Sequence, residues 1–194
     1  VQRHVAVLGK VCDGNARITT MDSDITVTNL TQYGNMTLNG HTLTVLQNVN
    51  QKGYISGDGG AMNVKGNYTQ LSGTLDLNGA AFTIDGNYRL QNIGEDEEGK
   101  QIYKTSYGVL KMNDKADYMT VGGDVYIQSY YGEGGNYNDL TNGILELKGN
   151  FYQLAHDSAS GSNFNAKDNH KVTFTGDGVQ TVNFEGSGSG FNYL

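Results

Sequence analysis

A repeat of about twenty residues is the feature that most restricts how this chain can fold. The pattern Gly-x-[Leu/Met]-x-[Leu/Met]-[Asn/Lys]-Gly begins at Gly34, Gly73, Gly108 and Gly143, with a single departure at Asp114. One unit of this length cannot bury an apolar face by itself, but stacking each unit on the next produces a continuous core. The repeat therefore predicts a stack of similar coils.

A second pattern follows the first in residues 44–51, 83–91 and 120–128, and each copy ends in glutamine. Apolar and other residues alternate within both patterns, which is the period of two expected of strands with one buried face. Coil starts at Gly34, Gly53, Gly73, Gly108 and Gly143 are 19, 20, 35 and 35 residues apart. The basic coil is therefore about twenty residues long, and the last two intervals contain insertions.

These patterns predict an all-β fold, a right-handed parallel β-helix (β-solenoid) of about seven coils with loops inserted on one side. The left-handed form is disfavoured because no strict hexapeptide period is present. A sandwich of antiparallel hairpins stays open as the alternative, since it is also rich in turns and alternates with period two.

We expect residues 1–194 to form a single β-solenoid domain, because the chain has the length of one ordinary domain. Residues 1–33 would be an N-terminal cap or first coil, including a strand at 5–11. Residues 34–169 would be regular coils with inserted loops, and residues 170–194 a degenerate terminal coil. Because the chain opens on Val1, we expect it to be a fragment of a larger protein.

Composition supports many turns and excludes several partners. The 28 glycines and 21 asparagines together make up one residue in four, and both residue types tolerate left-handed backbone. A net charge of -7 with only 13 scattered Lys and Arg argues against nucleic acid. No apolar run approaches the ~18 residues of a spanning helix, so no membrane insertion is expected. Cys12 is alone, which excludes an internal disulfide.

The extra residues enter the repeat at one place, directly after the glutamine of the second pattern. The insertions are residues 92–107, 129–142 and 155–169. Insertions at one position of a repeat emerge on one side of the stack, which is often the binding side. Function is therefore expected at these loops.

Tyrosines are concentrated in and around the first two insertions. Aromatic rings on a rigid stack can lie against the apolar faces of sugars while neighbouring polar groups reach the hydroxyls. Tyr118 and Tyr126 are interpreted instead as strand residues that pack the loops. The candidate ligand-binding residues are Tyr103, Tyr107, Tyr130, Tyr131 and Tyr137.

Catalytic and metal chemistry receive little support from the residues. Aligned coils predict that Asp76, Lys111 and Glu146 form one outward column, which is interpreted as a charge ladder rather than an inverting glycosidase pair. Asn39, Asn78 and Asn113 form a second predicted column with a structural role. The expectation is no catalytic residue, no metal site and no cofactor, with calcium at the acidic run 95–98 as a weaker alternative.

The repeats resemble modules of a known kind of protein. The Gly-x-Leu-x-Leu-Asn-Gly units, the Gly-Asn-Tyr-x-Gln units, residues 170–185 and residues 190–194 are similar to repeat regions of large secreted or cell-surface adhesin-like β-solenoid proteins of clostridia and their relatives. The resemblance covers roughly residues 34–194. It implies a secreted or cell-surface protein associated with the wall or with polysaccharide, and it carries over no catalytic residue.

Three functions follow in order of preference. The first is a non-enzymatic bacterial adhesin module that binds polysaccharide or glycan through the tyrosine-rich loops, with other surface proteins as further partners. The second is a structural spacer or filament-forming surface protein. The third is a polysaccharide lyase or hydrolase, which would need a cleft of carboxylates and bases.

Overall fold

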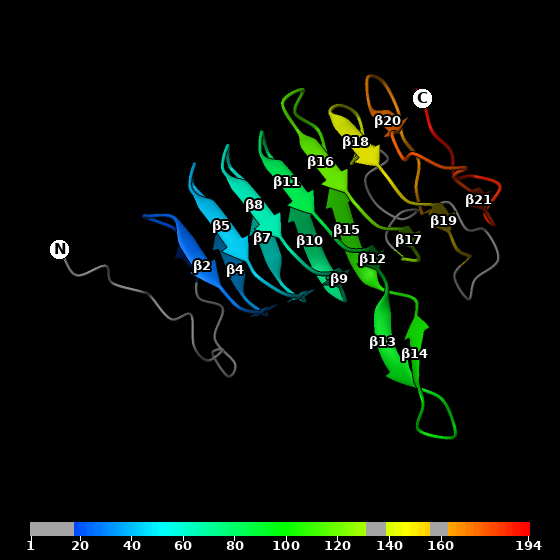
Figure 1. Ribbon diagram of the computed structural model, residues 1–194, viewed down its shortest axis with the longest axis horizontal. Coiled ribbons are helices and arrows are strands. Elements are labelled where there is room, and N and C mark those ends of the chain that lie inside the picture. The colour runs from blue at the N-terminus through cyan, green and yellow to red at the C-terminus, as the bar shows by residue number, and fades with distance from the viewer. Residues whose placement is uncertain (1–17, 131–138, 156–162) are drawn as a thin grey trace.

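The computed structural model describes residues 18–130, 139–155 and 163–194, and this part of the chain is all-β. Figure 1 shows the strands side by side in successive layers along the long axis. Three parallel sheets, here called A, B and C, contain five, seven and seven strands. The predicted all-β fold is confirmed, and the parallel pairing excludes the sandwich of antiparallel hairpins.

Sheet A has the strand order β1-β4-β7-β10-β15. Its strands are β1 (Ile18–Thr20), β4 (Asn35–Thr37), β7 (Tyr54–Ser56), β10 (Ser72–Asp76) and β15 (Tyr107–Lys111). Sheet B has the order β2-β5-β8-β11-β16-β18-β20. Its strands are β2 (Ile25–Val27), β5 (Thr42–Val45), β8 (Ala61–Val64), β11 (Ala81–Ile84), β16 (Tyr118–Val121), β18 (Ile144–Leu147) and β20 (Lys171–Phe174).

Sheet C has the order β3-β6-β9-β12-β17-β19-β21. Its strands are β3 (Leu30–Gln32), β6 (Val49–Gln51), β9 (Tyr68–Gln70), β12 (Tyr88–Leu90), β17 (Val125–Ile127), β19 (Phe151–Gln153) and β21 (Val182–Phe184). The chain visits sheets A, B and C in turn, and one such passage is called a coil below. This topology is consistent with a β-solenoid.

Strand register follows the sequence repeat through the first five coils. Gly73 pairs with Gly108, and Leu75 pairs with both Ile55 and Leu110. Equivalent positions of successive coils therefore lie directly above one another, which turns each position of the repeat into a column of side chains.

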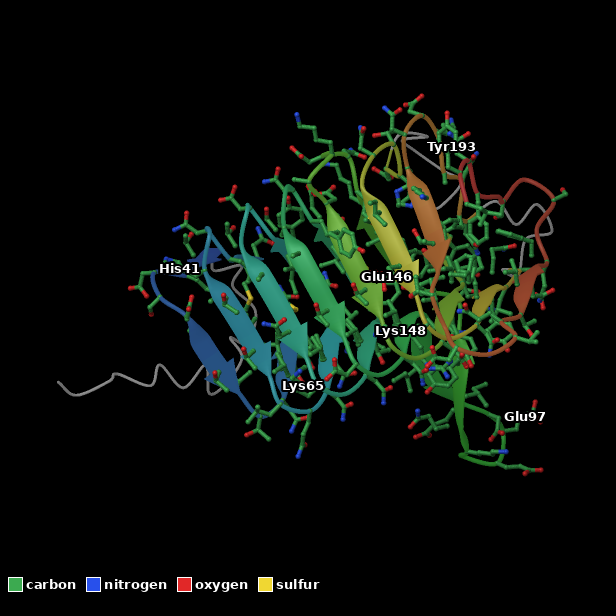
Figure 2. All side chains as sticks on the ribbon, turned by 45° about the horizontal axis from the view of Figure 1, so that its top comes forward. His41, Lys65, Glu97, Glu146, Lys148 and Tyr193 are labelled. Carbon is green, nitrogen blue, oxygen red and sulfur yellow. The ribbon has the colours of Figure 1, made fainter. Side chains whose placement is uncertain are left out.

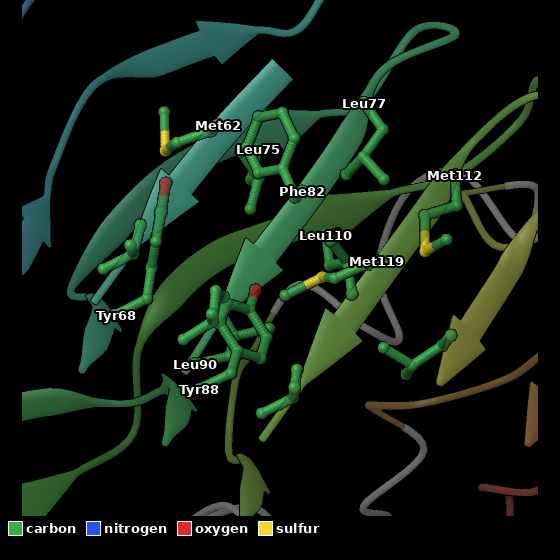
Figure 3. Packing of buried hydrophobic residues seen from close by; sticks show 14 of the residues in the cluster. Met62, Tyr68, Leu75, Leu77, Phe82, Tyr88, Leu90, Leu110, Met112 and Met119 are labelled. Atoms are coloured by element: carbon green, nitrogen blue, oxygen red, sulfur yellow. The ribbon is translucent and has the colours of Figure 1, made fainter. Parts of the chain in front are cut away.

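The core consists of the inward-facing residues of the three sheets. Leu75, Phe82 and Met119 are almost completely buried, and Figure 3 shows them with their neighbours between the sheets. Alternate residues on each strand, such as Thr83 between Phe82 and Ile84, remain partly exposed. Burial of this apolar column is the main stabilising contribution, at about 25 cal/mol per Å² of apolar surface.

Polar side chains also enter the core, and they bond to one another. Gln51 and Gln70 are fully buried and accept hydrogen bonds of 2.7 and 2.6 Å from the hydroxyls of Tyr68 and Tyr88. The Nε2 of Gln70 donates to the carbonyls of Gly73 and Val109. Burial raises the pKa of both tyrosines, so their hydroxyls stay protonated donors. A satisfied network avoids the cost of burying unpaired polar groups.

An asparagine ladder runs along the turn between sheets B and C. The side-chain oxygen of Asn48 accepts the backbone N–H of Asn67 at 2.9 Å, and Asn67 accepts that of Asn87 in the same way. The ladder continues through Asp124 to Asn150. Each bond stabilises the stack by about 1 kcal/mol, and the series explains the repeated Gly-Asn-Tyr units.

The glycines that precede the ladder residues from Asn67 onward permit the close approach of neighbouring coils. A Cβ on Gly86 would lie 2.6 Å from the carbonyl oxygen of Gly66, and one on Gly66 would lie 2.5 Å from that of Gln47. Only glycine fits this contact without moving the backbone.

Three alignments predicted from the repeat are wrong in detail. Gly143 does not begin a sheet A strand, because the segment after it enters sheet B, where Glu146 pairs with Thr120. Asn39 and Asn78 occupy equivalent left-handed turns, and the pairing of Asp76 with Lys111 keeps Asn113 level with Asn78, but the backbone of Asn113 is not left-handed. Finally, the aligned column of glutamines contains Gln51 and Gln70, whereas the pairing of Leu90 with Ile127 puts Gln91 and Gln128 one residue beyond it.

All three insertions begin directly after a strand of sheet C. The first forms an antiparallel hairpin of β13 (Asn92–Glu95) and β14 (Gln101–Lys104), which projects away from the sheets in Figure 1. The other two lie between β17 and β18 and between β19 and β20, and their described residues add no strand to sheet A. An isolated bridge from Met112 to Leu140 is what continues sheet A there. The strand predicted at 5–11 lies outside the described residues.

Candidate functional site

The candidate tyrosines belong to two different faces. Tyr103 lies in β14, Tyr107 begins β15, and Tyr130 follows Ser129, which bridges to Ser106. Tyr131 and Tyr137 lie outside the described residues. The structure therefore brings Tyr107 and Tyr130 together, and places Tyr103 with other partners.

Tyr107 and Tyr130 stack on each other at the outer face of sheet A. Their ring centroids are 4.9 Å apart with an interplanar angle of 29°. Tyr107 is 54% exposed, and Tyr54, two coils earlier on the same face, is 37% exposed. We call Tyr54, Tyr107 and Tyr130, with the charged pair described next, the sheet A tyrosine surface. It presents aromatic rings on a rigid parallel sheet.

An ion pair lies among these tyrosines. The Nζ of Lys111 is 2.9 Å from Oδ2 of Asp76, and the hydroxyl of Tyr54 donates to the same oxygen at 3.1 Å. The bond to Asp76 raises the pKa of Lys111, and burial together with Asp76 raises that of Tyr54. The predicted neighbours Asp76 and Lys111 are confirmed, while Glu146 is wrong as the third member.

Asp139 takes the position predicted for Glu146. It precedes Leu140, which bridges to Met112, so Asp139 lies on the rung beyond Lys111. Partial burial raises the pKa of its carboxyl, and the charge of Lys111 opposes that shift. The column therefore consists of a carboxylate (Asp76), an ammonium (Lys111) and a second carboxylate (Asp139) on successive rungs.

A second aromatic group covers the outer face of sheet C. The guanidinium of Arg89 lies 4.3 Å from the ring centroid of Tyr103 and 3.7 Å from that of Tyr126. Tyr126 stacks in turn on Tyr152, with centroids 5.0 Å apart and an angle of 17°. We call these four residues the sheet C stack. Contacts of this type contribute about 0.5–2 kcal/mol each.

The sheet C stack attaches the hairpin to the sheets. Tyr103 comes from β14, whereas its partner Arg89 comes from β12. Tyr126 also donates from its hydroxyl to Oδ2 of Asp124 at 3.0 Å. The interpretation of Tyr126 as a packing residue agrees with these contacts, because a charged or aromatic group lies over each face of its ring.

Tyr118 belongs to neither group, because it lies on the outer face of sheet B. Its hydroxyl donates to Glu146 at 2.5 Å, which lowers the pKa of Glu146. Figure 2 shows Glu146 on this face, with Lys65 nearer the N-terminal end and Glu97 far away at the hairpin tip. Tyr118 thus packs along its sheet, as its strand position suggests.

Metal-binding groups do not come together in the described ranges. No set of three or more His, Cys, Asp or Glu side chains there is arranged to hold a metal ion. In the acidic run predicted as a calcium alternative, Oδ1 of Asp96 instead accepts the backbone N–H groups of Glu98 and Lys100. The same part of the chain contains no helix long and apolar enough to cross a membrane.

Four residues of these surfaces escaped prediction from the sequence. Tyr54 lies in a coil without an insertion, and Arg89, Asp139 and Tyr152 carry no motif. Arg89 and Tyr152 were findable in principle, because each is the middle residue of a Tyr-x-Leu or Phe-x-Gln triplet at the repeated outward position. Asp139 required the actual pairing of the sixth coil.

Comparison of the chain with protein-family models, with curated proteins and with solved structures found no match. The assignment of function therefore depends on the geometry of the two surfaces.

Proposed function

We propose that this chain is a non-enzymatic module of a secreted or cell-surface protein, and that it binds a polysaccharide or glycan at the sheet A tyrosine surface. The observation that carries the proposal is the row of exposed rings, Tyr54 and Tyr107 above all, on one face of a parallel sheet. Such rings suit the apolar faces of sugars, and the partly exposed ammonium of Lys111, held by the buried Asp76, can donate to hydroxyl groups.

The proposed scaffold is a right-handed β-solenoid of the bacterial adhesin type. The passage of the chain through three parallel sheets in turn supports the solenoid. Right-handed connections between parallel strands of one sheet are the rule, which supports the handedness. A long parallel stack of this kind holds side chains at fixed intervals of about 4.8 Å, a spacing suited to an extended polymer.

A structural spacer is the second candidate, and one observation favours it. Tyr107 and Tyr130 cover one face of each other's rings, so part of the aromatic surface stabilises the stack itself. A lyase or hydrolase ranks below both, because Lys111 lies between the Asp76 and Asp139 rungs and pairs with Asp76.

The test measures binding to a panel of insoluble and arrayed polysaccharides, with product analysis in the same tubes. The double variant Tyr107→Ala/Tyr130→Ala is expected to weaken binding at least about tenfold. Its urea unfolding midpoint should stay within the range seen for variants of other exposed residues. Tyr118→Ala, which alters an exposed tyrosine on sheet B, is the matched control. Unchanged binding in the double variant, or no binding to any glycan, would reject the proposal in favour of the spacer. Released oligosaccharides would favour the enzyme.

A further inference from the structure

Arg89 is a cation held rigidly in the sheet C stack without a carboxylate partner. In the described part of the chain, the ion pairs are His41 with Asp24, Lys65 with Asp85 and Lys111 with Asp76. The rings of Tyr103 and Tyr126 lie against the guanidinium instead. A guanidinium that contacts two rings, and has no carboxylate within ion-pair distance among the described residues, can still attract an external anion.

The hydrogen-bonding capacity of Arg89 is mostly unused. A guanidinium carries five N–H donors. Within the described residues Nη1 donates to Oε1 of Gln91 at 3.0 Å, and the guanidinium also forms a hydrogen bond with the hydroxyl of Tyr126. Gln91 is itself fixed, since its Nε2 donates to Gln128 at 2.9 Å. The side chain is therefore oriented from three directions, by two rings and one amide, before any ligand arrives.

The geometry also selects the kind of anion. The rings of Tyr103 and Tyr126 lie over the guanidinium, whereas its N–H groups lie at its edges, in the plane of the group. Planar carboxylates accept two parallel bonds from that edge, which is the strongest arrangement available to arginine. Tyr103 is 44% exposed beside it and can contact the ring of a sugar that carries the carboxylate.

We propose that Arg89 is a carboxylate-binding residue, and that the glycan recognised by this chain is an acidic polysaccharide built from uronic acid residues. The inference rests on the proposed glycan-binding function of the chain, and it adds a second contact surface on sheet C together with the class of ligand. Tyr103 and Tyr126 are positioning residues for the guanidinium. The net charge of -7 repels polyanions at long range, so binding depends on this local contact rather than on general attraction.

The experiment compares three polymers by affinity electrophoresis and calorimetry. Polygalacturonate supplies the carboxylates, its fully methyl-esterified form has the same chain without the charge, and dextran sulfate supplies a different oxyanion. The proteins are the full chain, Arg89→Gln, Arg89→Lys and, as a control of equal charge change on sheet B, Lys65→Gln.

Arg89→Gln is expected to weaken binding of polygalacturonate by about 10- to 100-fold, the range for a lost charge-assisted bond. The affinity of Arg89→Lys for polygalacturonate should lie between those of the parent chain and Arg89→Gln, because lysine keeps the charge but lacks the two parallel N–H donors of the guanidinium. The affinity of Lys65→Gln should match that of the parent chain. Methyl esterification of the polymer should remove the difference between the parent chain and Arg89→Gln.

Two results would overturn the inference. The first is that Arg89→Gln binds polygalacturonate as tightly as the parent chain, or that the parent chain does not bind it at all. The other is equal or tighter binding of dextran sulfate with Arg89→Lys as active as the parent, which would indicate unselective electrostatics. Retained binding of a neutral glycan that depends on Tyr107 and Tyr130 would leave the proposed function standing while this inference fails.

Discussion

The middle coils and the last two coils solve the same packing problem in different ways. Between β4 and β12 each coil contributes a strand to all three sheets, and the core is mostly aliphatic, with Phe82 and the Gln51–Tyr68 and Gln70–Tyr88 pairs inside it. In the coils that contain β18 to β21, the described residues add no strand to sheet A. Phenylalanine rings fill the core there, with Phe151 at the centre of the cluster.

The difference shows what a strand contributes to such a stack. A missing strand removes both its backbone ladder and its inward side chains, and in the last coils larger rings occupy the released volume. Phe191 contacts Phe151, Phe174 and Phe184, so one residue near the C-terminus connects several strands. We expect the last coils to depend on a few side chains, and the middle coils on many equivalent ones.

The largest expected effect comes from removing the central ring of the last coils. Phe151 is fully buried, and its ring lies 4.9 to 5.4 Å from those of Phe164, Phe184 and Phe191. Phe151→Ala should lower the free energy of unfolding by about 3–5 kcal/mol. Urea titration with hydrogen exchange should show the last coils opening before the middle ones. Leu46→Ala, at a half-exposed position, is the control. Uniform loss of protection along the chain would contradict the proposed difference between the regions.

A smaller effect is expected in the middle coils from deleting one hydroxyl. Tyr88→Phe keeps the ring and leaves Oε1 of the buried Gln70 without its donor. The expected loss is about 1–2 kcal/mol, the cost of one unsatisfied buried polar group. Thermal unfolding of this variant and of Tyr33→Phe, whose side chain is 49% exposed, measures the difference. Equal midpoints for the two variants would mean that the internal network contributes nothing to stability.

The smallest effect is a pH dependence confined to the last coils. His170 is fully buried, its Nδ1 lies 2.7 Å from the carbonyl oxygen of Asn142, and its Nε2 has no hydrogen-bond partner among the described residues. Burial lowers the pKa of His170 below the ordinary value of 6.5. The unfolded chain therefore binds the proton first, so the free energy of unfolding is highest above pH 6.5 and falls as the pH drops below it.

Urea titrations between pH 7.5 and pH 5 test this prediction in the parent chain, His170→Gln and His41→Gln. The slope below about pH 6.5 should be smaller in His170→Gln than in the parent. His41 is only partly buried, so its replacement should retain the slope. A slope that persists unchanged in His170→Gln would assign the effect to carboxylates elsewhere.

The repeat predicted the column arrangement wherever coils keep the same length. Gly73 and Gly108 pair as aligned, and so do Asp76 and Lys111, even though the hairpin separates them. The same pattern misplaced Glu146, because the segment that starts at Gly143 has the repeat spacing but pairs in sheet B. The spacing of residues within a segment determines which side chains alternate between the buried and exposed faces. Which sheet the segment joins depends instead on where the preceding insertion ends.

The sequence predicted the type of residue that forms the candidate site, but it predicted only some of the residues that belong to it. Tyrosines around the insertions were expected at the surface, and Tyr103, Tyr107 and Tyr130 are all in aromatic or cationic contacts. Their division between sheets A and C, and the place of Arg89 between Tyr103 and Tyr126, join residues from separate coils. No local sequence pattern specifies such contacts, because each depends on the position along the stack at which the hairpin rejoins the sheets.

By itself, the sequence determined the all-β alternation, the period of the coils and the sites of insertion, because glycine spacing and alternation are local properties that every coil repeats. Only the tertiary structure decided which side chains became neighbours across coils, including Asp139 beside Lys111 and the phenylalanine cluster around Phe151. The physical reason is that a column is set by register. Register depends on the summed length and exit point of every insertion before it.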